Sequence, residues 1–193
     1  ALRVFSSADR LIPDAPRGAS RRISRVLRRY GASIELQSRI VAVQPDCVRD
    51  EDGRAWPSDV TVLARGLTPP GWLGSLGLPL GERGGLRANE WLQSPGDPRI
   101  FGAGDCIDFE PRALPRLGVF GVRQAPVLLH NLLAGFDGGP LRAYRPQRRW
   151  LSILNLGDGR ALATYGRFYA HGRWCMRWKN HLDQRFLERY RVK

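Results

Sequence analysis

The spacing of hydrophobic residues predicts that the chain opens with a β-α-β unit. Leu2–Phe5 and Ala32–Leu36 are short runs with the composition of β-strands. Between them, Ser20 is a typical N-cap for a helix that runs to Tyr30 and stops at Gly31. Apolar residues recur along this helix at helical spacing, namely Ile23, Val26, Leu27 and Tyr30. A helix between two strands is typical of a parallel sheet.

Two further β-rich segments follow. A small antiparallel hairpin or meander is predicted from three short strand-like runs and a turn at Glu51–Gly53, the runs being Arg39–Val43, Cys47–Val48 and Ala55–Trp56. The run Val60–Ala64 is bounded by Asp59 and Gly66, and its apolar character predicts a buried strand. Residues 66 to 98 are rich in Gly and Pro without a clear period, so we expect a long connection anchored by Trp72 and Leu76.

The second half of the chain alternates between strand and helix patterns. Arg99–Asp105 predicts a strand that ends in a glycine-rich turn. Leu117–Leu133 is apolar nearly all round and predicts a buried helix that Pro126 interrupts.

The pattern changes beyond Gly138–Pro140. Trp150–Leu156 and Ala161–Tyr165 predict a hairpin around Gly157–Arg160, with a third strand near Trp174–Trp178. A helix over Lys179–Arg191 closes the chain, and we expect its apolar face to cover these strands: Leu182, Phe186, Leu187 and Tyr190.

Composition excludes several classes of protein. The 193 residues are 42% hydrophobic and 25% charged, which rules out a disordered tail or a disulfide-dense miniprotein. The net charge is +13, but only Lys179 and Lys193 are lysines and the arginines are scattered along the chain. This pattern favours a basic face that meets an acidic partner or anionic lipid over a nucleic-acid groove.

Cysteine and histidine positions point to neither a metal site nor a dithiol pair. Cys47, Cys106 and Cys175 are far apart and form no Cys-x-x-Cys motif. The three histidines, His130, His171 and His181, lack the spacing of metal ligands. We therefore expect reduced thiols, as in a cytoplasmic protein, and no metal.

The segment Ile100–Cys106 carries the strongest chemical signal. A strand that runs into Gly-Asp places Asp105 at the carboxyl end of a sheet, where α/β folds bind ligands. Gly104 lets the backbone approach a ligand closely, and the carboxylate of Asp105 can accept hydrogen bonds from hydroxyl groups. The alternative is an ordinary turn carboxylate that caps the next loop.

A second glycine-containing segment lies eleven residues further on. Leu117–Pro126 opens the apolar helix, and Gly118 and Gly121 allow close packing or close approach of a ligand. The N-terminus of a helix favours negative charge.

These segments together resemble the carboxyl-terminal part of the FAD-dependent pyridine nucleotide-disulfide oxidoreductases. The branch is that of type II NADH dehydrogenases and sulfide–quinone reductases. Val60–Gly66 resembles the family's strand that ends in Ala-Thr-Gly, with Arg65 at the Thr position. Four later segments resemble a subgroup of NADH-dehydrogenase-like flavoproteins, some of them fused to selenide, water dikinase: Tyr144–Gln147, Leu156–Ala161, Arg177–Asn180 and Leu182–Phe186.

The resemblance implies an α/β fold, a partial doubly wound FAD/NAD(P)-binding fold with a small carboxyl-terminal domain of β-sheet plus helix. Residues 1–66 would end the NAD(P)H-binding domain and residues 67–98 would form a connection. Residues 99–137 would end the FAD-binding domain, and residues 138–193 would form the hairpin–helix domain.

The resemblance also implies an oxidoreductase that passes electrons from NAD(P)H through FAD to a quinone or similar acceptor. Asp105 would contact the ribitol or phosphate of FAD. Gly104, and Gly66 at the end of the Val60–Gly66 segment, would be further cofactor-binding residues. Gly118, Val119 and Phe120 would lie beside the pyrimidine edge of the flavin. No catalytic residue is assigned.

The family's Gly-x-Gly-x-x-Gly motifs are not found in these residues. We therefore expect a carboxyl-terminal fragment that is inactive alone and whose main partner is the missing FAD and NAD domains. A homodimer and the inner face of an anionic membrane are further expected partners. The competing hypothesis is a basic, non-enzymatic module for nucleic acid or anionic membrane that uses Trp150, Trp174, Trp178 and Tyr190.

Overall fold

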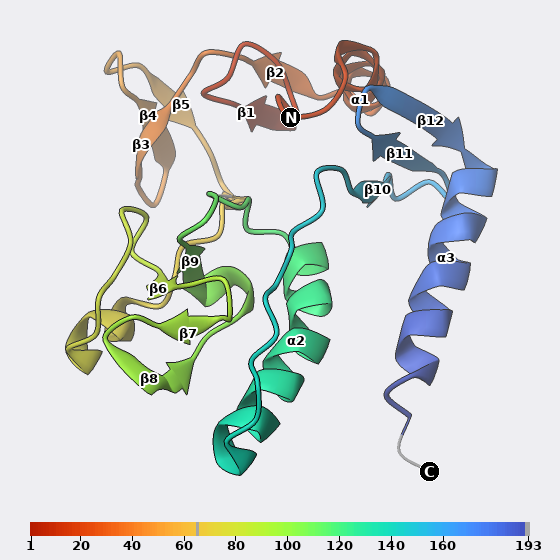
Figure 1. Cartoon of the computed structure of the whole chain (residues 1–193). Helices are drawn as coiled ribbons and strands as arrows, with labels where there is room; N and C mark the ends of the chain where they lie inside the picture. The colour runs from red at the N-terminus through yellow and green to blue at the C-terminus, as the bar shows by residue number, and fades with distance from the viewer. Residues whose placement is uncertain (65, 192–193) are drawn as a thin grey trace. The chain divides into compact units, whose positions relative to one another are not determined.

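The computed structural model describes residues 1–64 and 66–191 (Figure 1). The chain forms two compact units: Ala1–Val62 together with Arg149–Lys193 is the first unit, and Leu63–Arg148 is the second. This grouping differs from the four consecutive domains expected from the sequence, because the segments at the two ends of the chain pack together. The functional limits of those domains remain a prediction.

The first unit opens with the expected β-α-β arrangement. Strand β1 (Arg3–Phe5) pairs in parallel with β2 (Ser33–Glu35), and helix α1 (Arg17–Arg29) connects them. The helix begins three residues before Ser20, directly after Pro16, so the prediction of Ser20 as N-cap is wrong. The fixed φ of proline suits a helix start, and Ser20 is instead buried inside the helix. Tyr30 is 58% exposed and lies outside the buried stripe.

The meander and the hairpin also form where the sequence predicts them. Strands β3 (Ile40–Val43), β4 (Cys47–Asp50) and β5 (Ala55–Pro57) are antiparallel. Strands β10 (Leu151–Asn155), β11 (Ala161–Tyr165) and β12 (Phe168–Gly172) form a second antiparallel sheet. Both predictions are confirmed because the residues of a short turn determine how the two strands beside it pair.

The third strand and the closing helix lie earlier than expected. Strand β12 follows β11 after a tight turn with Gly166 at φ +56°, and helix α3 (Arg173–Glu188) begins directly after β12. Trp174 and Trp178 are therefore helical, one turn apart, with ring centroids 6.4 Å from each other. The prediction of a strand there is wrong. It rested on the preference of tryptophan for strands, whereas the i, i+4 spacing of the two residues also places them on one face of a helix.

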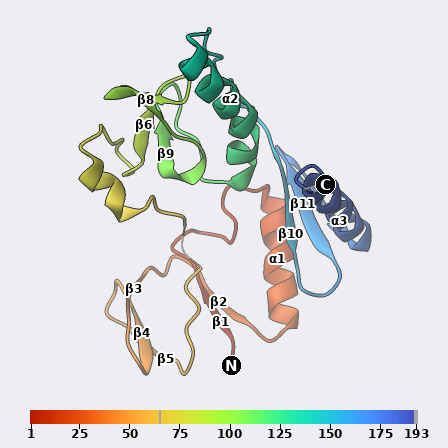
Figure 2. The same ribbon diagram turned by 90° about the horizontal axis from the view of Figure 1, so that it is seen from below.

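Strand β11 is the centre of the first unit, because both of its faces are covered (Figure 2). Leu162 packs with Leu11, Ala19 and Ile23 on the α1 side. Ala161 and Ala163 pack with Cys175 of α3 on the other side. Successive residues of a strand point to opposite faces, so one strand serves both clusters.

The outer turns of α3 do not cover the sheet. The four residues expected to do so are between 37% and 66% exposed: Leu182, Phe186, Leu187 and Tyr190. Cys175, in the first turn, is fully buried and makes the contact instead. The expectation that this apolar face lies on the strands is therefore wrong.

The run Val60–Ala64 forms no strand in the structure. Val60 and Val62 are 84% and 85% exposed, so the prediction of a buried strand is wrong. A strand needs a neighbour for its backbone hydrogen bonds, and none of the strands in the described residues pairs with this run.

The second unit contains more regular structure than its composition suggests. It comprises the 3-10 helix η1 (Gly71–Leu76), strands β6 (Leu86–Ala88), β7 (Gln93–Ser94), β8 (Asp97–Phe101) and β9 (Ile107–Phe109), the 3-10 helix η2 (Gly104–Cys106) and helix α2 (Gly118–Asp137). Strands β6 and β9 pair in parallel, and β7 and β8 form a hairpin. Leu73 is buried, whereas Trp72 and Leu76 are exposed. The prediction that Trp72 and Leu76 anchor the connection over residues 66 to 98 is therefore wrong.

Helix α2 buries one face only. Its buried residues follow helical spacing: Phe120, Gln124, Val127, Asn131 and Ala134. Leu129, Leu133 and Phe136 are 60%, 55% and 88% exposed, so the prediction of burial all round is wrong. The helix also continues through Pro126 without interruption. A helix that covers a small layer can bury only the stripe facing that layer.

Candidate functional site

Two glycines allow η2 to lie against the first turns of α2. Gly104 has φ +75°, a conformation that favours glycine. A Cβ atom on Gly121 would lie 3.3 Å from the Cα atom of Gly104, so neither backbone leaves room for a larger residue without movement. The site residues of η2 and of the start of α2 are therefore brought together.

Arg116 holds the backbone at Asp105 in place. Its Nε donates to the carbonyl oxygen of Asp105 at 3.0 Å, and its Nη2 lies 3.0 Å from the carboxylate of Asp108. Asp108 also accepts hydrogen bonds from the backbone N–H groups of Arg83 and Gly85. This ion-pair network fixes the turn that follows β8.

The carboxylate of Asp105 itself is left free. Asp105 is half-buried, and its side-chain oxygens have no hydrogen-bond or ion-pair partner among residues 1–64 and 66–191. An ionised carboxylate only accepts hydrogen bonds, so it is suited to a ligand that presents hydroxyl groups. The structure shows no cap of the next loop by this carboxylate.

Gln124 is a site residue that the sequence analysis missed. Its Oε1 accepts a hydrogen bond from the N–H of Gly104 at 2.6 Å, and the side chain is only 1% exposed. The sequence did contain a signal for it, because Gln124 is a polar residue on the same helical face as the apolar residues Phe120 and Val127. Arg116 was missed as well, because nothing in the sequence distinguishes it from the other arginines.

The first turn of α2 is open. Its N-cap residue Leu117 makes no side-chain capping bond, and the turn contains no acidic residue. Gly118 is exposed, and a Cβ atom placed on it would meet nothing within 4 Å. Val119 is half-buried and Phe120 is 3% exposed, so Phe120 supports the helix from the core. An uncapped helix N-terminus of this kind favours an anionic or electron-rich group.

The remaining predicted site residue, Gly66, lies apart from these elements in the chain. It is exposed and belongs to no helix or strand. Arg65 lies outside the described residues. The structure therefore groups Gly104, Asp105, Gly118, Val119 and Phe120 but does not attach Gly66 to them.

The described part of the chain shows neither a metal-ligand cluster nor a helix suited to crossing a membrane. No cluster of three or more metal-ligating side chains occurs there. Among the same residues, no helix combines the length and the apolar character that crossing a membrane requires.

Comparison with known proteins identifies the family. The model of the pyridine nucleotide-disulphide oxidoreductase family matches residues 2–127. The type II NADH:quinone oxidoreductase of Haemophilus influenzae is 26% identical over 167 residues, which cover 84% of this chain and 37% of that protein. The mitochondrial internal alternative NAD(P)H-ubiquinone oxidoreductase A1 of Solanum tuberosum is 30% identical over 139 residues, covering 66% of this chain and 27% of its own length.

Solved structures agree at the level of the fold. The sulfide:quinone oxidoreductase of Aquifex aeolicus superposes with a TM-score of 0.73 at 18% identity, covering 96% of this chain and 49% of that chain. The NAD-dependent persulfide reductase of A. fulgidus gives a TM-score of 0.64 at 22% identity, covering 83% and 30%. The mixed helix-and-strand fold expected from the sequence is confirmed as that of the FAD/NAD(P)-binding oxidoreductases.

The chain spans less than half the length of each of these relatives. The family match nevertheless covers most of its residues, including Gly104, Asp105 and the start of α2. The chain belongs to the pyridine nucleotide-disulphide oxidoreductase family.

Proposed function

We propose that these residues form part of an FAD-dependent oxidoreductase that passes electrons from NAD(P)H to a quinone or a similar acceptor. The observation that carries the proposal is the unpaired carboxylate of Asp105, in the turn that packs against the open start of α2. The quinone oxidoreductases among the relatives support the class of reaction.

The residues fit FAD in two respects. Asp105 can accept a hydrogen bond from a ribityl hydroxyl, since its carboxylate has no partner among the described residues. Gly118 leaves space at the start of α2, where the helix dipole favours electron density on the pyrimidine edge of the flavin. When bound, FAD supplies the hydride and electron chemistry. Arg116, Gln124 and Gly121 hold the two segments in place for it.

We propose further that the FAD pyrophosphate loop lies in another part of the full-length polypeptide. The relatives are at least twice as long as the portion matched here, and these residues contain no Gly-x-Gly-x-x-Gly motif. On this proposal, residues 1–66 complete the NAD(P)H-binding domain and residues 99–137 the FAD-binding domain. The 193 residues alone then neither retain FAD nor oxidise NAD(P)H.

The exposed apolar residues on the outer turns of α3 support a peripheral position at the inner face of a membrane as part of the same proposal. The net charge of +13 is of the sign that anionic lipid attracts. Self-association through exposed apolar faces is the alternative use of these surfaces.

The test replaces Asp105 with Ala in the full-length polypeptide. A hydrogen bond to a charged group contributes about 1.5–3 kcal/mol, so we expect FAD to dissociate roughly 10- to 100-fold more readily. The measurement is the flavin that remains bound after dialysis, over a series of protein concentrations. Asp137→Ala, at the opposite end of α2, is the matched control. Equal flavin retention in the Asp105→Ala and Asp137→Ala proteins would contradict the assignment.

A further inference from the structure

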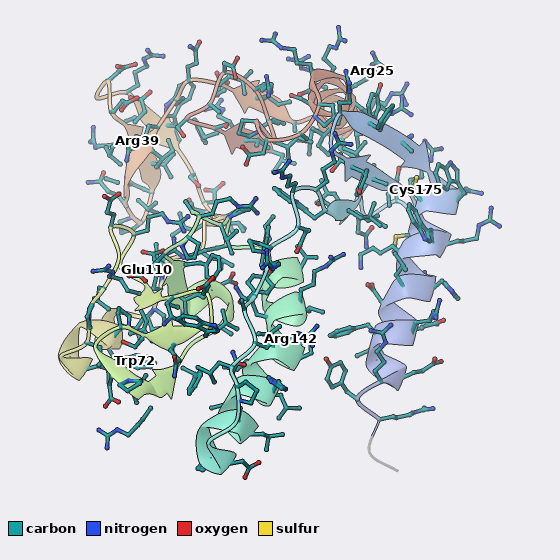
Figure 3. The ribbon with its side chains drawn as sticks, in the orientation of Figure 1. Arg25, Arg39, Trp72, Glu110, Arg142 and Cys175 are labelled. Carbon is teal, nitrogen blue, oxygen red and sulfur yellow. The ribbon has the colours of Figure 1, made fainter. Side chains whose placement is uncertain are left out.

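A second candidate site lies in the first unit, between α1 and β12. It is a cavity of about 280 Å³ lined by Gly18, Arg21, Arg22, Arg25, Tyr169 and His171. Figure 3 labels Arg25 on α1. The lining thus contains three guanidinium groups, and it includes no carboxylate from the described residues. Neither the family assignment nor the FAD proposal uses these residues.

The secondary structure sets the shape of this cavity. Gly18, Arg21, Arg22 and Arg25 have the spacing of one helical face of α1. Tyr169 and His171 are two apart in β12 and share one face of the sheet. A Cβ atom on Gly18 would lie 2.4 Å from Cε1 of Tyr169, so the tyrosine ring rests directly on the helix backbone.

The contact between Arg22 and His171 determines the protonation of the histidine. Nη2 of Arg22 lies 2.9 Å from Nδ1 of His171. A guanidinium group can only donate, so Nδ1 must accept and the ring proton resides on Nε2. The imidazole is therefore neutral, and its Nε2–H is a hydrogen-bond donor.

Two buried donors in this cluster have no acceptor. Nε of Arg22 and Nε2 of His171 are both inaccessible to solvent and have no hydrogen-bond partner in the described structure. Leaving such groups without a partner is costly, and native structures rarely do so. Both N–H groups therefore need a hydrogen-bond acceptor that the described residues do not supply.

The two outer arginines lack a counter-charge. Arg21 and Arg25 are exposed, and neither forms an ion pair within residues 1–64 and 66–191. Asp158, a carboxylate that acts on His171, already lies 3.9 Å from Arg160. The cavity therefore combines buried donors with accessible positive charge.

We propose that this cavity binds a phosphate group, either as a free oxyanion or as a small phosphate ester. A phosphate offers several acceptor oxygens and a negative charge, and arginine forks match its geometry. The cavity volume is below the 300–1,000 Å³ range of pockets for drug-sized ligands. This size suits one or two phosphate groups rather than a dinucleotide.

The experiment titrates the full-length protein with inorganic pyrophosphate in a calorimeter. We expect saturable binding that weakens at least tenfold in Arg21→Gln/Arg25→Gln, since both residues are exposed and their replacement leaves the core intact. Arg28→Gln is the matched control, because Arg28 is on the same helix and outside the cavity lining. We expect this control to bind within twofold of the parent protein. In a nuclear magnetic resonance titration, the Nε2 signal of His171 shifts as pyrophosphate is added.

A second arm distinguishes the source of the phosphate. Vesicles containing phosphatidic acid are compared with vesicles of equal charge containing phosphatidylserine. Preference for phosphatidic acid that Arg21→Gln/Arg25→Gln abolishes would support a lipid phosphate, and binding of pyrophosphate alone would support a soluble one. Absence of saturable binding in both arms would overturn the proposal. An equal loss in Arg28→Gln would do so too, because it would show a general charge effect.

Discussion

Two buried amide side chains, Gln124 and Asn131, attach α2 to the rest of its unit. Asn131 donates to the carbonyl oxygens of Trp91 and Arg142 at 2.7 and 2.9 Å, and it accepts from the N–H of Arg142 at 2.7 Å. Gln124 accepts from Gly104. Both are fully or almost fully buried, so each satisfies backbone groups that water cannot reach.

Replacing Gln124 with Met should leave the N–H of Gly104 without an acceptor. An unsatisfied buried donor costs about 1–3 kcal/mol, so we expect the free energy of unfolding to fall by that amount. FAD should also be retained less well in the full-length protein, because the turn carrying Asp105 loses its anchor. Chemical denaturation and flavin retention are the measurements. Leu129→Met, on the exposed face of α2, should change neither, and an equally stable Gln124→Met protein would refute the role given to Gln124.

The pKa of His171 is lowered from its ordinary value of 6.5, first because the partly buried ring loses hydration and then because Arg22, Arg160 and Arg29 repel its charged form. Asp158 acts in the opposite direction. As the pH falls below about 6.5, the unfolded chain takes up the proton before the folded chain does. The stability associated with the neutral ring is therefore present above that pH and is lost as the pH falls through the folded pKa.

We expect acidification from about pH 7.5 to 5.5 to lower the melting temperature more in the parent protein than in His171→Gln. Glutamine does not titrate in this range, so the difference between the two proteins isolates the histidine. Thermal unfolding followed by circular dichroism is the measurement. The same pH dependence in both proteins would mean that His171 titrates with its ordinary pKa.

At the scale of elements, β11 contributes buried residues to two apolar clusters of the first unit, one on each face of the strand. Leu162 is 1% exposed and joins the cluster with Leu11, Ala19 and Ile23. Phe186, on the outer turns of α3, is 37% exposed. The loss of unfolding free energy on truncating an apolar side chain increases with the volume of the cavity it leaves. Truncating Leu162 should therefore destabilise the protein more than truncating Phe186.

Leu162→Ala should lower the free energy of unfolding by about 2–5 kcal/mol. Phe186→Ala should lower it by less than about 1 kcal/mol, since much of the ring already contacts solvent. Urea denaturation of the two variants beside the parent protein measures both values. If Phe186→Ala were the more damaging change, α3 would cover the sheet along its whole length.

At the scale of the whole molecule, both units expose apolar side chains. Val60 and Val62 are almost fully exposed in the first unit, and Leu129, Leu133 and Phe136 are exposed in the second. Large exposed apolar patches are typical of surfaces that meet another chain or another domain. Such surfaces fit a second copy of the chain and, on the proposed function, further domains of the full-length polypeptide.

Because of these exposed surfaces, we expect the 193 residues expressed alone to self-associate. On the proposed function, we also expect them to carry no flavin absorbance. Replacing Leu129 and Phe136 together with Glu should shift the population towards monomers, since like charges oppose burial of that face. Sedimentation velocity with absorbance detection measures both properties in one run. A monomer at high concentration would contradict the first expectation, and stoichiometric flavin absorbance would contradict the second.

The sequence by itself determined the elements whose causes are local. The β-α-β opening, the meander, the hairpin around Gly157–Arg160 and the stop of α1 at Gly31 all follow from turn residues and short-range periodicity. Asp105 after a hydrophobic strand was also apparent, because the strand and its turn are contiguous in the chain.

Only the tertiary structure decided which apolar runs are buried and which polar groups meet. Val60–Ala64 has the composition of a buried strand but no partner strand in the described residues. Gln124 meets Gly104, and Arg22 meets His171 across 149 residues of sequence. Burial and long-range hydrogen bonds depend on which surfaces pack together, and that is set by the sum of many weak contacts rather than by any local pattern.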